Sequence, residues 1–202
     1  ELATFNLSEI KYYNFQIDSI AGINNIIISR TGYTGETGFE LYVKNKHVRK
    51  LWDALFSTSI ETKAIGLAAR DTLRLEKGFC LYGNDINETT SSIEAGLGWI
   101  TKFTKEFINH EELKAQKEGG ATRKLVGLEL IEKGIARNGY PIVTSEAMDI
   151  GVVTSGTMSP TLSKAIAMAY VPKEFSNIGS EVFIQVRNKQ IKAKVVSLPF
   201  VK

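Results

Sequence analysis

Ser29-Arg30-Thr31-Gly32-Tyr33-Thr34-Gly35-Glu36-Thr37-Gly38-Phe39-Glu40 is the most informative stretch of this 202-residue chain. Its three glycines recur at every third position, between one apolar run at 26–28 and another at 39–43. Glycine at this spacing allows positive φ angles or the close approach of another group. The stretch therefore predicts a turn-rich loop between two strands, with Tyr33, Glu36 and Glu40 near one bend.

Glu40 is the most unusual residue of the stretch, because it opens a strand whose neighbours are apolar. We expect its carboxylate to be partly buried and paired, since a buried charge needs a partner. The loop lacks the Gly-Lys-Ser/Thr of a nucleotide-binding loop, and no helix follows it as a dinucleotide fingerprint requires. Two interpretations stay open on the residues alone: a hairpin connection with Glu40 paired to a nearby Arg or Lys, or a binding loop.

Residues 30–36 and 38–40 closely resemble the signature of the glycine cleavage T-protein family, the folate-dependent aminomethyltransferases. Four further stretches resemble the same family and follow its order along the chain: 69–76 (ARDTLRLE), 80–85 (CLYGND), 94–99 (EAGLGW) and 154–160 (TSGTMSP). Any one of them alone would be a weak signal. Together they make a specific match from about residue 29 to the end of the chain.

Composition bounds the alternatives. The net charge of +3, with basic residues scattered along the chain, indicates no nucleic-acid partner. No run approaches the roughly 20 apolar residues of a membrane span. One cysteine, Cys80, excludes a disulfide framework and is expected to be a small buried residue. His47 and His110 lie far apart, so the sequence predicts no metal site.

The predicted fold is α+β: the C-terminal part of a T-protein-like folate-binding domain over residues 1–120, followed by a small β-barrel over 121–202. Gly119-Gly120 marks the boundary. In the first part we expect strands at 12–17, 23–28 and 39–44, helices at 46–57, 66–76 and just after Asn109, and an extended run at 97–103. Short strand-like runs separated by Gly and Pro predict the barrel: 125–130, 142–144, 150–154, 166–170, 182–186 and 191–197.

Arg70 and Arg74 lie four residues apart on the predicted helix at 66–76 and share a face. Like charges at this spacing repel. Asp71 is placed to pair with Arg74, which leaves Arg70 to find an acid or a ligand elsewhere. A carboxylate, an arginine and a tyrosine together suit a flat, nitrogen-rich ring, which fits a pterin as well as a purine.

The family resemblance distinguishes between a pterin and a purine. It implies tetrahydrofolate as the cofactor, lipoylated H-protein as the partner, and transfer of an aminomethyl carbon to folate with release of ammonia. It implies folate contacts for Glu40, Arg70 and Tyr33. The family's catalytic aspartate lies upstream of every residue of this sequence, so no catalytic residue is named.

The chain begins with Glu1 rather than Met, and the resemblance begins partway through the family pattern. We therefore expect a fragment whose N-terminal part is missing and which is inactive alone, from the bacterial cytoplasm or, in a eukaryote, the mitochondrial matrix. Two other functions stay open: a non-catalytic folate-binding accessory protein of iron–sulfur cluster assembly, and the folate domain of a sarcosine or dimethylglycine dehydrogenase.

Overall fold

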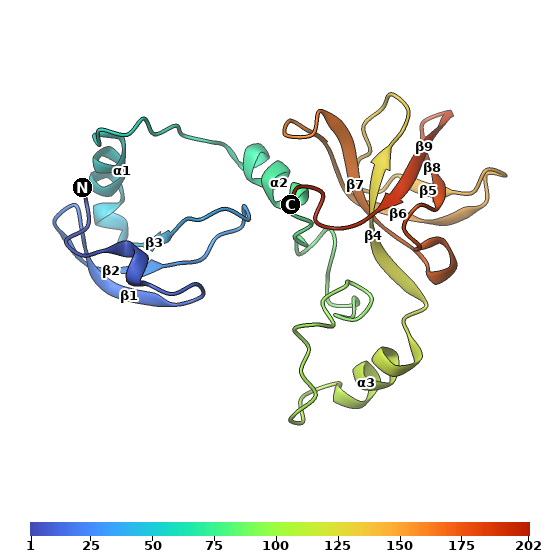
Figure 1. Ribbon diagram of the computed structural model, residues 1–202, viewed down its shortest axis with the longest axis horizontal. Coiled ribbons are helices and arrows are strands. Elements are labelled where there is room, and N and C mark those ends of the chain that lie inside the picture. The colour runs from blue at the N-terminus through green and yellow to red at the C-terminus, as the bar shows by residue number, and fades with distance from the viewer. The chain divides into compact units, whose positions relative to one another are not determined.

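The computed structural model describes residues 1–202, which form two compact units, 1–70 and 71–202. The predicted α+β class with a closed barrel is confirmed (Figure 1). None of the helices has the length and apolar character needed to cross a bilayer. The two units are described in turn.

The first unit contains a three-stranded antiparallel sheet in the order β1 (Phe15–Ile20), β2 (Ile23–Ser29), β3 (Glu40–Tyr42). A short helical turn, η1 (Leu7–Glu9), precedes it. A turn at Ala21-Gly22 joins β1 to β2, between the two strands that the sequence predicts, and both residues have positive φ, 52° and 68°, as the commonest two-residue hairpin turn requires. β1 begins at Phe15 rather than Tyr12, because the left-handed φ of 60° at Tyr13 interrupts an extended run.

One face of this sheet packs on α1 (Val48–Phe56), which follows a helical turn, η2 (Asn45–His47). Ile26 and Ile28 of β2 are fully buried there, together with Leu51 of α1. The apolar residues at helical spacing in this helix suggest a fully buried face, but not all of them are buried. Trp52 is 53% exposed, and it packs on the ring of Phe56, with 4.9 Å between ring centroids.

Two further helices lie where the sequence predicts them, and the cap of one of them differs from the expected form. α2 (Leu67–Glu76) ends as expected before Gly78, whose φ is 67°. α3 (His110–Gly119) begins directly after Asn109, but Asn109 is left-handed and its side chain makes no cap hydrogen bond. The predicted extended run at 97–103 was wrong: it forms turns, and Thr101 donates a hydrogen bond back to the Leu97 carbonyl. Such local side-chain bonds compete with a strand.

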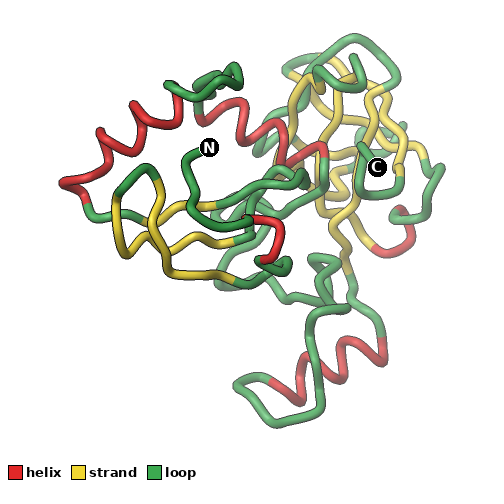
Figure 2. Tube along the Cα trace, turned by 60° about the vertical axis from the view of Figure 1, so that its left-hand side comes forward, coloured by secondary structure: helices red, strands yellow, loops and turns green.

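The predicted barrel is present as six antiparallel strands that close on themselves. Figure 2 draws these strands, like all others, in yellow. A helical turn, η3 (Lys173–Phe175), lies between the fourth and fifth of these strands along the chain. The strands pair in the order β4-β7-β6-β5-β8-β9, and β9 pairs back with β4. Their bounds are β4 (Arg123–Leu130), β5 (Pro141–Val143), β6 (Asp149–Ser159), β7 (Lys164–Pro172), β8 (Glu181–Val186) and β9 (Lys189–Val196). Leu128, Ile142, Val153, Val182 and Ile184 fill the interior and are fully buried.

A buried ionic network joins the second half of α2 to the barrel. Arg74 and Asp85 are 0% and 1% exposed, and their charged groups lie 2.5 Å apart. Asp71 accepts from Arg74 Nε at 2.8 Å, as the sequence predicted. Burial alone would lower the pKa of Arg74, but the charges of Asp85 and Asp71 outweigh it and raise that pKa. No buried side-chain polar atom is left without a partner.

β6 contributes two consecutive hydroxyls to this network. The pairing of β6 with β7 shifts between Val153 and Ser155, so Thr154 has no partner opposite it. Both Thr154 and Ser155 are buried and both donate to the carboxylate of Asp85, at 2.5 and 2.8 Å. A β-bulge of this kind re-aims side chains that would otherwise alternate between the two faces.

A second acid of α2 reaches the barrel without a cation. Glu76 is buried and accepts from the hydroxyls of Ser159 and Thr161, at 2.5 and 2.8 Å. Its backbone carbonyl also accepts from the amide of Val201 at 3.0 Å. The end of α2 is therefore fixed on the barrel by two separate polar clusters.

Candidate functional site

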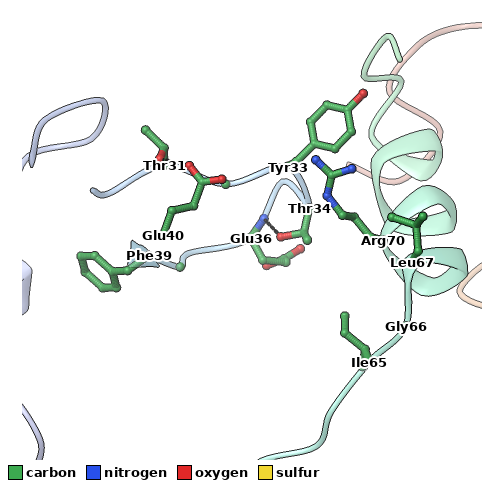
Figure 3. A pocket seen from close by; sticks show the side chains of 12 residues that line it. Thr31, Tyr33, Thr34, Glu36, Phe39, Glu40, Ile65, Gly66, Leu67 and Arg70 are labelled. Carbon is green, nitrogen blue, oxygen red and sulfur yellow. Dashed lines mark hydrogen bonds between the residues drawn. The ribbon is translucent and has the colours of Figure 1, made fainter. Parts of the chain in front are cut away.

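The loop between β2 and β3 forms one wall of a pocket of about 510 Å³ in the first unit (Figure 3). Thr31, Tyr33 and Glu36 line it from the loop, and Phe39 and Glu40 from the start of β3. Ile65 to Leu67 and Arg70 close the other side. Gly35 has a φ of 75°, which lets the chain reverse between Thr34 and Glu36. Of the three spaced glycines only Gly35 has a positive φ, and Gly32 and Gly38 have no atom within 4 Å of where a Cβ would stand.

All three residues named from the sequence, Glu40, Arg70 and Tyr33, line this one pocket. They come from the start of β3, from α2 and from the middle of the loop. Residues 30 to 40 positions apart in the chain thus share one site, as the sequence-based hypothesis requires.

The expectation that Glu40 is partly buried was wrong, and the open alternative of a hairpin with Glu40 paired to an Arg or Lys finds no such ion pair. Glu40 is exposed, and its hydrogen-bond partners are the hydroxyls of Thr31 and, weakly at 3.5 Å, Tyr42. The cause is the two-residue period of the strand. Leu41 faces α1, so Glu40 and Tyr42 both lie on the opposite, open face of the sheet.

The two hydroxyls prepare the Glu40 carboxylate for a ligand. Both donate to the same oxygen, Oε2, while Oε1 accepts no hydrogen bond from the protein. The Thr31 hydroxyl is itself held 3.0 Å from that of Ser29. Oε2 is therefore held by protein hydroxyls, and Oε1 is left to accept a hydrogen bond from a ligand.

Arg70 and Tyr33 form the second element of the pocket. The guanidinium carbon of Arg70 lies 4.7 Å from the centre of the Tyr33 ring, a cation–π contact visible in Figure 3. The contact keeps two flat groups together in the lining of the pocket. A flat ligand ring could stack on either one while the other binds its polar edge.

Sequence reasoning missed the hydroxyls of Thr31 and Tyr42. The signal for Tyr42 was present, because residues two apart in a strand lie on one face, and Tyr42 stands two residues after Glu40. No comparable signal existed for Thr31, whose position depends on the path of the loop.

Cys80 and the histidines add no chemistry here. Cys80 is half-buried, and burial raises the pKa of its thiol to about 11, which disfavours the reactive thiolate. No three His, Cys, Asp or Glu side chains are grouped to hold a metal ion.

Comparison with protein families decides what kind of protein carries this pocket. The model described as "GCVT N-terminal domain" matches residues 1–105, and the model described as "Glycine cleavage T-protein C-terminal barrel domain" matches residues 123–202. The chain belongs to the glycine cleavage T-protein family. Its six-stranded barrel is the part that the second family description names.

Relatives within the T-protein family are similar along the whole chain. A protein of Flavobacterium psychrophilum named "Aminomethyltransferase" is 53% identical over 100% of this chain, and one of Bacteroides fragilis with the same name is 55% identical. The chain spans 56% and 57% of the length of these two T-proteins.

A solved T-protein structure has the same fold. It is the glycine cleavage system aminomethyltransferase T of Bartonella henselae, with a TM-score of 0.86 and 37% identity. The match covers 96% of this chain and 54% of that one.

Proposed function

We propose that this chain is the tetrahydrofolate-binding portion of an aminomethyltransferase of the glycine cleavage system. The observation that carries the proposal is the convergence of Glu40, Tyr33 and Arg70 on one pocket in a chain of this family. Tetrahydrofolate, when bound, would accept the aminomethyl carbon as a one-carbon unit while ammonia leaves. Lipoylated H-protein would carry that carbon.

The pocket suits folate in size and in chemistry. Small-molecule sites span roughly 300–1,000 Å³, and this pocket falls within that range. A carboxylate oxygen that accepts no hydrogen bond from the protein can accept an N–H bond from a 2-aminopyrimidinone edge. Glu40 offers that carboxylate, and Tyr33 with Arg70 offers a flat surface and a cationic fork.

Each residue then has a limited role. Glu40 binds and orients the ring rather than moving protons, because Thr31 and Tyr42 already hold its Oε2 in place. Arg70 provides positive charge for a ring carbonyl or a carboxylate of the ligand. The main contribution of these residues is positioning, which replaces a bimolecular collision by a held geometry.

The names of the curated relatives favour the transferase over the two alternatives, the iron–sulfur accessory protein and the folate domain of a dehydrogenase. The bacterial source of these relatives favours the cytoplasm over a mitochondrial matrix. Nucleic acid and membrane are not among the proposed partners. The proposed domain division remains at residue 120, which falls between the two family matches.

The test is tetrahydrofolate binding by calorimetry to the wild-type chain and to a Glu40→Gln variant. Charged hydrogen bonds contribute about 1.5–3 kcal/mol, so we expect affinity to fall about 10- to 100-fold. Glu61→Gln is the matched control, because Glu61 is exposed, pairs only with Lys63 at 3.3 Å and lies outside the pocket. Equal affinity of the Glu40→Gln variant and the wild type would overturn the proposal.

A further inference from the structure

The positive charge of the first unit is concentrated in one short stretch. Residues 44–50 (Lys44-Asn45-Lys46-His47-Val48-Arg49-Lys50) hold four Lys or Arg and no acid. The other residues of 1–70 hold four Lys or Arg and seven Asp or Glu, so that remainder is net negative. The basic residues are therefore not scattered throughout, as the sequence-based analysis assumed. This stretch is a local positive pole.

The stretch surrounds a hollow of about 330 Å³, separate from the Glu40 pocket and sharing no residue with it. Lys44, Lys46, His47 and Lys50 line it from one side. Gly22 to Asn25, at the tip of the β1–β2 hairpin, line the other. We call this hollow the lysine pocket. No Asp or Glu lines it, so the protein supplies no counter-charge inside it.

The three lysines that line the lysine pocket make no ion pair. The one polar contact among them is that of Lys50 Nζ with the Gly22 carbonyl, at 3.5 Å. Arg49 differs, because it pairs with Asp53 at 3.7 Å and does not line the pocket. The lysines that line the hollow are thus cations without an ion pair in the protein.

The surroundings increase this positive potential. α1 begins at Val48, with no acid in its first turn and no side-chain cap. Acids are the residues usually found there, because a helix N-terminus carries partial positive charge. Here Arg49 and Lys50 occupy that turn instead. Asn24 and Asn25, which are polar and uncharged, also line the hollow.

The kind of cation indicates the kind of anion. Lysine binds phosphate as a compact point charge, whereas arginine recognises carboxylate and phosphate alike through a planar, two-pronged fork. Several lysines around one hollow suit a compact anion with more than one negative charge. The pocket is lined by lysines and excludes its one neighbouring arginine. We propose that the lysine pocket binds a small soluble anion that carries phosphate groups.

The test is titration of the chain with inorganic pyrophosphate, followed by calorimetry, in wild type and in a Lys46→Gln/Lys50→Gln double variant. We expect the dissociation constant to rise at least about tenfold in the double variant, which is about 1.4 kcal/mol. Lys114→Gln/Lys133→Gln, on exposed positions outside the pocket, changes net charge equally. It should stay within about twofold of the wild type, because neither of these lysines lines the lysine pocket.

Backbone amide shifts locate the ligand independently. Pyrophosphate should shift the amide signals of Asn24, Asn25 and Lys46 in the NMR spectrum, while acetate at equal ionic strength should not. Equal weakening in both double variants would mean attraction to net charge alone and would overturn the proposal. Failure of pyrophosphate to bind, or binding only to anionic lipid vesicles, would overturn it as well.

Discussion

Arg70 and Arg74 stand one turn apart on α2, and their surroundings are opposite. Arg74 is fully buried and its guanidinium is held by Asp71, Asp85, Ser155 and the Phe79 carbonyl. Arg70 is exposed and stacks on the Tyr33 ring.

The two acids differ in the same way. The carboxylate oxygens of Asp85 are saturated by protein donors, whereas Glu40 keeps one oxygen available. Charges that hold the fold have their partners inside the protein, and charges suited to a ligand do not.

The largest effect on stability is expected from removing Asp85, the buried acid that pairs with Arg74. Asp85→Ala would leave Arg74 buried without its main counter-charge, and breaking a buried pair costs about 3–5 kcal/mol. Urea unfolding followed by circular dichroism measures it. Asp71→Ala is the control and should cost less, because the Asp71 side chain is half-exposed and Arg74 keeps Asp85. A loss below about 1 kcal/mol for Asp85→Ala would contradict the assignment of this network to stability.

The apolar residues of the two units should differ in the same direction. Leu128 is fully buried in the barrel, and Leu128→Ala should lower the free energy of unfolding by about 2–5 kcal/mol. Trp52 is large but half-exposed on α1, so Trp52→Ala should cost less than Leu128→Ala despite removing more atoms. The same urea titrations compare the two. The reverse order would show that the open face of α1 carries more of the stability than its exposure implies.

A salt bridge of intermediate burial should have an intermediate effect that depends on pH. Glu94 accepts from Arg123 at 2.8 and 3.1 Å, and these bonds hold the pKa of Glu94 below its ordinary value. Stability from a depressed carboxyl pKa is present above the unfolded value of about 4.3 and is lost as the pH falls through the folded value. Because Arg123 is 45% exposed, Glu94→Gln should cost only about 1 kcal/mol at pH 7.

The pH series provides the control for that prediction. In urea unfolding at pH 7, 5 and 3.5, the difference in stability between wild type and Glu94→Gln should shrink as the pH falls. A difference that stays constant over the series would mean that lost packing, rather than lost charge, causes the destabilisation.

The smallest effect on stability is expected at the pocket itself. Arg70→Gln removes an exposed charge with no ion pair, so the free energy of unfolding should change by no more than about 0.5 kcal/mol. Its tetrahydrofolate affinity should fall nonetheless, with Arg70→Lys recovering little, since an ammonium lacks the flat stacking surface. A large loss of stability in Arg70→Gln would assign this residue to the fold rather than to the pocket.

The sequence predicted most of the fold because its signals were local. Turn residues at regular spacing located the six barrel strands, and Ala21-Gly22 located the hairpin. The errors occurred where local signals compete. Thr101 bonds to the Leu97 carbonyl within a run that alternates like a strand, and Trp52 on α1 stays half-exposed although it is spaced like a core residue.

The sequence predicted which residues line the candidate site, but it did not predict the exposure of Glu40. Family motifs named Glu40, Arg70 and Tyr33, which the pocket brings together. Exposure of Glu40 depends on which strand face α1 covers, a fact of packing between elements distant in sequence. The lysine pocket was missed because composition was averaged over the chain, although residues 44–50 read alone would have revealed it.

The unpaired residue in β6 makes strand length itself a constraint. With Thr154 present, two successive hydroxyls reach one carboxylate. Deleting a single residue there would restore strict alternation, and one of the two hydroxyls would turn to the other face of the barrel wall. We therefore expect β6 to tolerate several side-chain substitutions but no insertion or deletion of a residue. Substitution data alone would not reveal this constraint.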